Sequence, residues 1–371
     1  MNLKRLFWAV LALGAISCST DDADNPKEEV KVTAKADFVV IGEDLDRVFQ
    51  YSYEGAVDNG QLVDLTDQLG VLPSYLTLRQ VNELLSFYSF GGGAFSLAQI
   101  DLATGARANF DDFYANGPGR SVVWGANNLS NVFFAYLGPS GTRNLAIQSV
   151  NLQDFSTEDL TVDFDIDTAF QPLFFGERIF ITYRDGRGDY KLTAYDTESK
   201  TLGTYLNFGD VPISILIDDM GDLVVVKNGV DASIEVYDIN TMSLVRSAQL
   251  DFNSGFSPGP VEGAVLSGDR LYYALPFVQP ARYPAGPAIF DFVTQENFVA
   301  DLTGIATEIE QELKTTVLIT AQSYDPQQEV FLVGYGTTSD EVLGGVMQIA
   351  IDGQLVANIT FPFFPTYFVK N

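Results

Sequence analysis

The 371-residue chain contains no histidine and a single cysteine, Cys18. Without histidine it lacks Ser-His-Asp and Cys-His catalysis, histidine-ligated zinc or iron, and the usual general base near neutral pH. A single cysteine excludes internal disulfides and thiolate metal clusters. An enzyme of this composition would have to work with carboxylates, tyrosine, lysine or arginine.

Basic residues are also scarce. Lys and Arg number 21 against 49 Asp and Glu, which gives a formal net charge of −28. A general nucleic-acid-binding protein needs the opposite sign, so nucleic acid is not an expected partner. The acidic side chains favour solubility. Hydrophobic residues form 46% of the chain, which is enough for a large packed core.

The N-terminus has the pattern of an export signal. Lys4 and Arg5 precede the apolar run Leu6–Ile16. This run is shorter than the ~20 residues that span a bilayer, and its proportions are those of a signal peptide. We therefore expect residues 1–17 to be a signal peptide. Residues 18–35 are polar and acidic, and we expect them to form a flexible tether.

The segment Ala15–Cys18 resembles a bacterial lipoprotein signal, in which the peptide is cut before a cysteine that is then lipidated. The run Ser19–Asp24 is similar to the surface-export tag of Bacteroidota lipoproteins. The resemblance implies that Cys18 carries acyl chains such as palmitate and anchors the protein in the outer membrane, facing the cell exterior. Acyl chains contribute ~0.8 kcal/mol of membrane-binding free energy per buried methylene, so several chains would anchor the protein stably. The alternative is an ordinary secretory signal with an incidental cysteine.

The rest of the chain repeats one β-rich unit. In residues 211–241, three short β-branched runs are separated by polar, Gly-containing turns, which is typical of an antiparallel meander. A proline enters the first strand of several units, where its missing donor is tolerated. An Asp or Asn closes the third strand and starts a tight turn. First strands are predicted to begin near residues 72, 120, 171, 211, 260, 318 and 364.

Spacings of 40 to 58 residues between these starts suit four-stranded blades. The sequence therefore predicts an all-β fold, a seven-bladed β-propeller over residues 36–371. The last start, Phe364, has no strands after it, whereas residues 36–65 have no proline-led first strand. We expect the C-terminal strand to pair with the N-terminal blade and close the ring, which removes a free edge. The pattern resembles the YncE-like and siderophore-associated propeller lipoproteins of Bacteroidota.

A ligand site is predicted on the loops that join the second strand of each blade to the third. Four arginines and four aromatic residues lie on or beside these loops, and arginine forks with aromatic planes suit a planar or anionic ligand. A carboxylated glycan or an iron-loaded catechol-type chelate fits that description. The alternative is that these arginines are exposed and pair with nearby carboxylates such as Asp185 and Asp189. The candidate ligand-binding residues are Arg143, Tyr183, Arg184, Arg187, Phe277, Arg282, Tyr283 and Tyr335.

One helix is expected, over Leu302–Leu313, with Thr307 and Glu310 as a capping box. Its place before a first strand puts it on the face of the ligand loops, as a lid or a structural plug. No metal or cofactor is predicted. Asp163, Asp165 and Asp167 alternate along one strand but lack the glycine and glutamate of a calcium loop.

Three functions remain open. The first is non-catalytic capture of an iron–siderophore chelate or a glycan for an outer-membrane importer, with a TonB-dependent transporter as the candidate partner. The second is a carboxylate-based glycosidase or lyase, which needs two carboxylates ~5–10 Å apart. Glu262 is the best channel-facing acid, and no second partner is evident. The third is a protein-interaction scaffold, because blade fold alone does not decide function.

Overall fold

The computed structural model describes residues 34–117, 119–137 and 143–370, and of residues 161–165 it describes the backbone alone. The expected signal peptide at 1–17, Cys18 and nearly all of the tether at 18–35 lie outside the described residues. Residues 35–371 form one compact unit. No helix among the described residues is long and apolar enough to cross a membrane.

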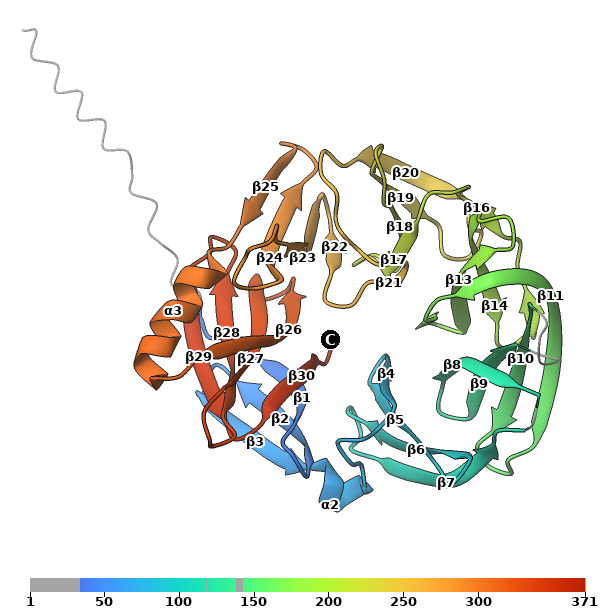
Figure 1. Ribbon diagram of the computed structural model, residues 1–371, viewed down its shortest axis with the longest axis horizontal. Helices are drawn as coiled ribbons and strands as arrows, with labels where there is room; N and C mark the ends of the chain where they lie inside the picture. Colours follow the sequence, from blue (N-terminus) through green and yellow to red (C-terminus); the bar gives the residue numbers. More distant parts are fainter. Residues whose placement is uncertain (1–33, 118, 138–142, 371) are drawn as a thin grey trace, which may run out of the picture. The chain divides into compact units, whose positions relative to one another are not determined.

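Seven blades stand around a central axis, as the sequence predicts (Figure 1). Blade 1 contains β1 (Phe38–Glu43), β2 (Val48–Glu54) and β3 (Asn59–Asp64), and blade 2 contains β4 (Thr77–Val81), β5 (Leu84–Gly91), β6 (Ala94–Asp101) and β7 (Arg107–Ala115). Blade 3 contains β8 (Ser121–Asn127), β9 (Asn131–Leu137), β10 (Asn144–Asn151) and β11 (Thr157–Ala169). Blade 4 contains β12 (Leu173–Phe175), β13 (Arg178–Asp185), β14 (Tyr190–Asp196), β15 (Thr201–Leu202) and β16 (Leu206–Asn207).

Blade 5 contains β17 (Ile213–Ile217), β18 (Leu223–Lys227), β19 (Ser233–Tyr237) and β20 (Leu244–Gln249). Blade 6 contains β22 (Val265–Ser267), β23 (Arg270–Pro276), β24 (Ala285–Asp291) and β25 (Glu296–Val299). Blade 7 contains β26 (Val317–Asp325), β27 (Val330–Thr337), β28 (Gly344–Ala350) and β29 (Leu355–Phe361). Strand β30 (Phe364–Phe368) completes blade 1, and the short β21 (Gly259–Pro260) lies between blades 5 and 6. The described helices are α2 (Leu65–Leu69) and α3 (Leu302–Leu313).

The hydrophobic core lies between the blades. Seven clusters of buried side chains each draw residues from two neighbouring blades, and together they run around the ring. Sheets packed face to face in this way bury the middle strands on both sides. Every residue of β27 is buried accordingly. This explains why second and third strands have nearly continuous apolar runs in the sequence.

The ring closes through the chain's own C-terminus. Strand β30 pairs antiparallel with β1, and Val40 lies opposite Phe368. The predicted closure is therefore confirmed. Gly42 is required at this seam, because a Cβ there would collide with the Phe363 ring and the Phe364 carbonyl oxygen. Two glutamines of blade 7 hold the start of the propeller: Gln348 exchanges hydrogen bonds with the Ala36 backbone at 2.7–2.8 Å, and Gln328 does so with Asp37.

Two details differ from the sequence expectation. Pro73 does not enter a strand, and β4 begins at Thr77, because residues 72–76 form a turn. Pro260 lies in β21, which pairs in parallel with β17 of blade 5 rather than with blade 6. Gly259 makes this possible because its backbone has φ +106°, a value that side-chain-bearing residues rarely adopt.

Candidate ligand channel

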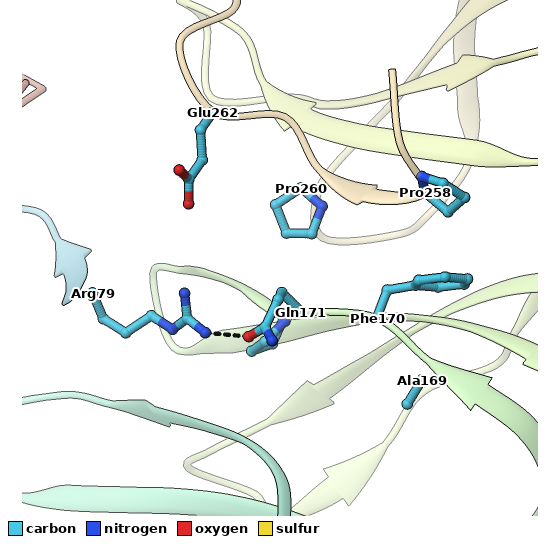
Figure 2. Close-up of a pocket in the computed structure, with 8 residues that line it drawn as sticks. Arg79, Ala169, Phe170, Gln171, Pro258, Pro260 and Glu262 are labelled. Atoms are coloured by element: carbon cyan, nitrogen blue, oxygen red, sulfur yellow. Dashed lines mark hydrogen bonds between the residues drawn. The ribbon is translucent and has the colours of Figure 1, made fainter. Parts of the chain in front are cut away.

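The innermost strands of the blades surround a channel with a polar cavity of about 320 Å³. Its walls come from the segment before β12, the segment around β21, and β4 (Figure 2). The lining residues are Arg79, Ala169, Phe170, Gln171, Pro172, Pro258, Pro260 and Glu262. A concave volume of this size with a few convergent polar groups is typical of a small-molecule site.

Arg79 is the main donor in this cavity. Its guanidinium donates to the side-chain oxygen of Gln171 and, at 3.4 Å, to the Gly125 carbonyl oxygen. Both acceptors are neutral. Burial lowers the pKa of Arg79, and the negative charge of Glu262 is among the influences that oppose this effect. Glu262 points toward the space beside Arg79 and Gln171 (Figure 2).

A second cavity, also of about 320 Å³, adjoins the first through Glu262. Strands β26 and β30 form most of its wall, which includes Thr320, Gln322 and Thr366. Tyr367 and Lys370 lie in the same wall. The two cavities meet at Glu262. Glu262 is the only carboxylate among the residues that line them, and the sequence prediction that it faces the channel is confirmed.

The predicted loop arginines lie in other places. Arg184 donates to Asp167 of β11 and forms an ion pair with it. Arg187 is exposed in the turn between β13 and β14. The carboxylate of Asp185 accepts from the backbone N–H groups of Arg187 and Asp189 at 2.9 and 3.0 Å. This carboxylate therefore organises the turn, and neither arginine lines the channel cavities.

Arg282 belongs to a contact with α3. It forms an ion pair with Glu310 and lies 5.1 Å from the ring centroid of Tyr283. Tyr283 is buried, with its hydroxyl directed at the Val317 carbonyl oxygen. Phe277 is half-buried against Gly286. This group joins blade 6 to the helix.

The remaining predicted residues are separate from these. Tyr335 is fully buried, and its hydroxyl donates to Asn358 at 2.8 Å. Tyr183 is buried in the core between blades 3 and 4. Arg143 is exposed at the end of a loop whose other residues, 138–142, are not described. The structure thus distributes the eight predicted residues over several blades, and their contact with a ligand stays a prediction.

The helix α3 has the predicted bounds but a different cap. Asp301 accepts a hydrogen bond from the Gly304 N–H and is the N-cap. Thr307 instead bonds the Thr303 carbonyl oxygen inside the helix, so the capping-box prediction is wrong. Ile305 and Ile309 are buried in the core between blades 6 and 7. The helix lies toward the rim of the ring, away from its axis (Figure 1). It is a structural element of the rim rather than a lid over the channel.

Arg79, Gln171 and Lys370 are not among the site residues predicted from the sequence. Arg79 was hidden because the first strand of blade 2 was placed five residues too early. Lys370 follows the strand that the sequence places innermost, so the closure prediction contained a signal for it. Among the described side chains, no group of three His, Cys, Asp or Glu residues is arranged to hold a metal ion.

Comparisons with known proteins support the fold alone. No protein-family model matches the chain, and no curated protein does. A structure of puromycin hydrolase is 12% identical with a TM-score of 0.52, covering 90% of this chain and 55% of that one. TolB from Acinetobacter baumannii is 14% identical with a TM-score of 0.40, covering 89% of this chain and 80% of that one. This chain therefore spans about half the length of puromycin hydrolase, and at such identities the likeness extends to the propeller architecture only.

Proposed function

We propose that this protein is a non-catalytic outer-membrane lipoprotein that captures an extracellular ligand in its propeller channel for an importer. The ligand class proposed is an iron chelate or a glycan. The observation that carries the proposal is the polar channel site, in which Arg79, Gln171 and Glu262 converge on a cavity of about 320 Å³. Hydrogen-bonding groups around a preformed concave volume suit small-molecule capture.

The cavity lies on the face of the propeller opposite the point where the first blade begins. Asp37 is bonded to Gln328, which lies in the turn between β26 and β27. The cavity lined by Gln171 and Pro258 lies instead beside segments that enter first strands. In a propeller these two kinds of connection lie on opposite faces.

Catalysis by paired carboxylates has less support. A glycosidase needs two carboxyl groups ~5–10 Å apart, and Glu262 is the only one among the residues lining the two cavities. The role of Glu262 in the proposed function is electrostatic. Its charge supports the protonated forms of both Arg79 and Lys370.

The proposal is tested by calorimetric titration with iron(III) complexes of catechol and 2,3-dihydroxybenzoate, and with short glycans ending in glucose or glucuronate. At least one probe should bind. Arg79→Gln should weaken that binding by about 10-fold or more, because hydrogen bonds to a charged group contribute ~1.5–3 kcal/mol. Arg107→Gln is the matched control, since Arg107 is exposed on β7.

The double variant Arg184→Ala with Arg187→Ala tests the loop location predicted from the sequence. Unchanged affinity would support the channel, whereas loss of binding in this variant alone would move the site to the loops. Release of new reducing ends from a glycan would contradict the non-catalytic proposal. Cys18→Ser should shift the protein out of the membrane fraction, and its retention there would contradict the lipid anchor.

A further inference from the structure

The C-terminal strand β30 lies on the inner side of the ring and points toward its centre (Figure 1). Strand β30 is the innermost strand of blade 1, and the Val369 N–H continues its ladder by donating to the Val39 carbonyl oxygen at 2.9 Å. The chain after β30 therefore runs into the channel rather than toward the outer surface. Lys370 is the last described residue.

A single side chain of blade 2 fixes this segment. The Gln80 side-chain oxygen accepts from the Lys370 N–H and from the Tyr367 hydroxyl, both at 3.0 Å. Its NH₂ group donates to the Lys370 carbonyl oxygen at 2.6 Å. Two hydrogen bonds hold the backbone of Lys370 in one place, and the third ties Tyr367 to the same side chain. Its side chain lines the second cavity.

The Lys370 ammonium forms no hydrogen bond or ion pair with any described residue, although Glu262 acts on it electrostatically. Solvent in the channel reaches the Lys370 side chain. Protein surrounds the rest of this side chain, and the resulting desolvation lowers the pKa of Lys370. Arg79 is similar because it donates only to neutral oxygens. Most other described arginines are paired with a carboxylate: Arg47, Arg120, Arg178, Arg184, Arg246, Arg270 and Arg282.

Arg107, Arg143, Arg187 and Lys314 also have no carboxylate partner among the described residues, and Arg79 and Lys370 differ from them in lining the two cavities. Cations held in a partly desolvated cavity attract anions more strongly than the same groups in open water, because the effective dielectric constant is lower there. The guanidinium offers a fork that matches a carboxylate, and the ammonium offers a compact charge. One acid, Glu262, faces both of them.

We infer that Lys370 and the C-terminal segment form the floor of the channel, and that Lys370 and Arg79 together receive the carboxylate group of the captured ligand. The inference rests on the proposed function and specifies its ligand class: a small molecule with a carboxylate at its leading end and hydroxyl groups behind it. The hydroxyls would meet Gln171 and Thr366, which line the same two cavities.

Matched pairs of probes test the inference. Glucuronate is compared with glucose, and 2,3-dihydroxybenzoate with catechol, by calorimetric titration at one ionic strength. The native protein should prefer the carboxylate-bearing member of a pair by about 10-fold or more. Lys370→Gln should reduce that preference by about 10-fold while leaving the affinity for the neutral member within about 2-fold. Arg107→Gln should leave both affinities unchanged.

The outcomes separate the two proposals. Equal binding of both members of each pair would overturn the carboxylate inference and leave capture in the channel standing. A preference that survives in Lys370→Gln and in Arg79→Gln would also overturn the inference. If the folded native protein bound neither member of either pair, nor any of the iron complexes or glycans, the proposed function would fall together with the inference. A melting curve for each variant checks that it is folded.

Discussion

At the residue scale, carboxylates in this protein mainly hold turns. Asp185 is the clearest example: it is buried, accepts two backbone N–H groups of the β13–β14 turn and pairs with Lys191 at 2.5 Å. The exposed fractions of the two side chains are 10% and 15%, so solvent screens this pair little. The sequence-based alternative, in which Asp185 pairs with a neighbouring arginine, is replaced by pairing with Lys191 across the hairpin.

This arrangement predicts a pH-dependent effect. Hydrogen bonding from Lys191, followed by the turn N–H groups, lowers the pKa of Asp185. A carboxyl group with a lowered folded pKa contributes stability above its unfolded value of ~3.9, and that contribution is lost as the pH falls through the folded value. Asp185→Asn should therefore reduce the free energy of unfolding by about 1–2 kcal/mol at pH 7.

The measurement is urea unfolding at several pH values. The difference between native protein and Asp185→Asn should shrink below pH ~3.9. Asp340→Asn serves as a control, because Asp340 is exposed. A difference that stays constant from neutral to acid pH would contradict the ion-pair explanation.

At the element scale, helix α3 is held both by its own apolar face and by contacts with distant parts of the chain. Its apolar residues Leu302, Ile305 and Ile309 are buried between blades 6 and 7, and the helix has the bounds predicted from the sequence. Its second contact comes from far along the chain, where Glu310 accepts from Arg282 and from the Val317 N–H. The carboxylate of Glu310 therefore binds neighbouring elements and does not cap the helix.

The cap gives a prediction at this scale. Asp301→Ala removes the acceptor for the Gly304 N–H and should lower the free energy of unfolding by about 1 kcal/mol. Thr307→Ala removes only a bond to a carbonyl oxygen within the helix and should cost less. Urea unfolding of both variants measures the difference. A larger loss for Thr307→Ala would show that the capping box operates in solution.

At the scale of the whole molecule, stability depends on the seam between β1 and β30. Phe363 and Phe368 are buried there, and Phe363 stacks on Phe49 at 5.4 Å between ring centroids. Each blade face is covered by its neighbours. Loss of one seam therefore exposes two cores at once and leaves an unpaired edge on β1.

Deletion of residues 364–371 should consequently destabilise the entire ring. A buried aromatic side chain contributes ~1.5–3 kcal/mol, and the stability of a domain is only ~5–15 kcal/mol, so the truncated protein should unfold or aggregate. Deletion of residues 369–371 is the matched control, because it keeps β30 and removes the channel floor. Circular dichroism and size-exclusion chromatography measure the outcome. A folded monomer without β30 would contradict closure by this strand.

The sequence by itself determined the class of fold, the number of blades and the pairing of the chain ends. Those features follow from short-range patterns: apolar runs of strand length, Asp and Gly turns, and the unpartnered Phe364 segment. The sequence also determined which chemistries were excluded, since no histidine exists to perform them.

Only the tertiary structure decided the location of the candidate site. The side chains around the channel come from residues as distant as Arg79, Gln171, Glu262 and Lys370, and no local pattern relates them. The loop arginines looked free in the sequence, but Asp167 and Glu310 pair with Arg184 and Arg282 through contacts between strands and between a loop and a helix. Strand periodicity depends on neighbours in the chain, whereas a channel is made by the residues that ring closure brings to the axis.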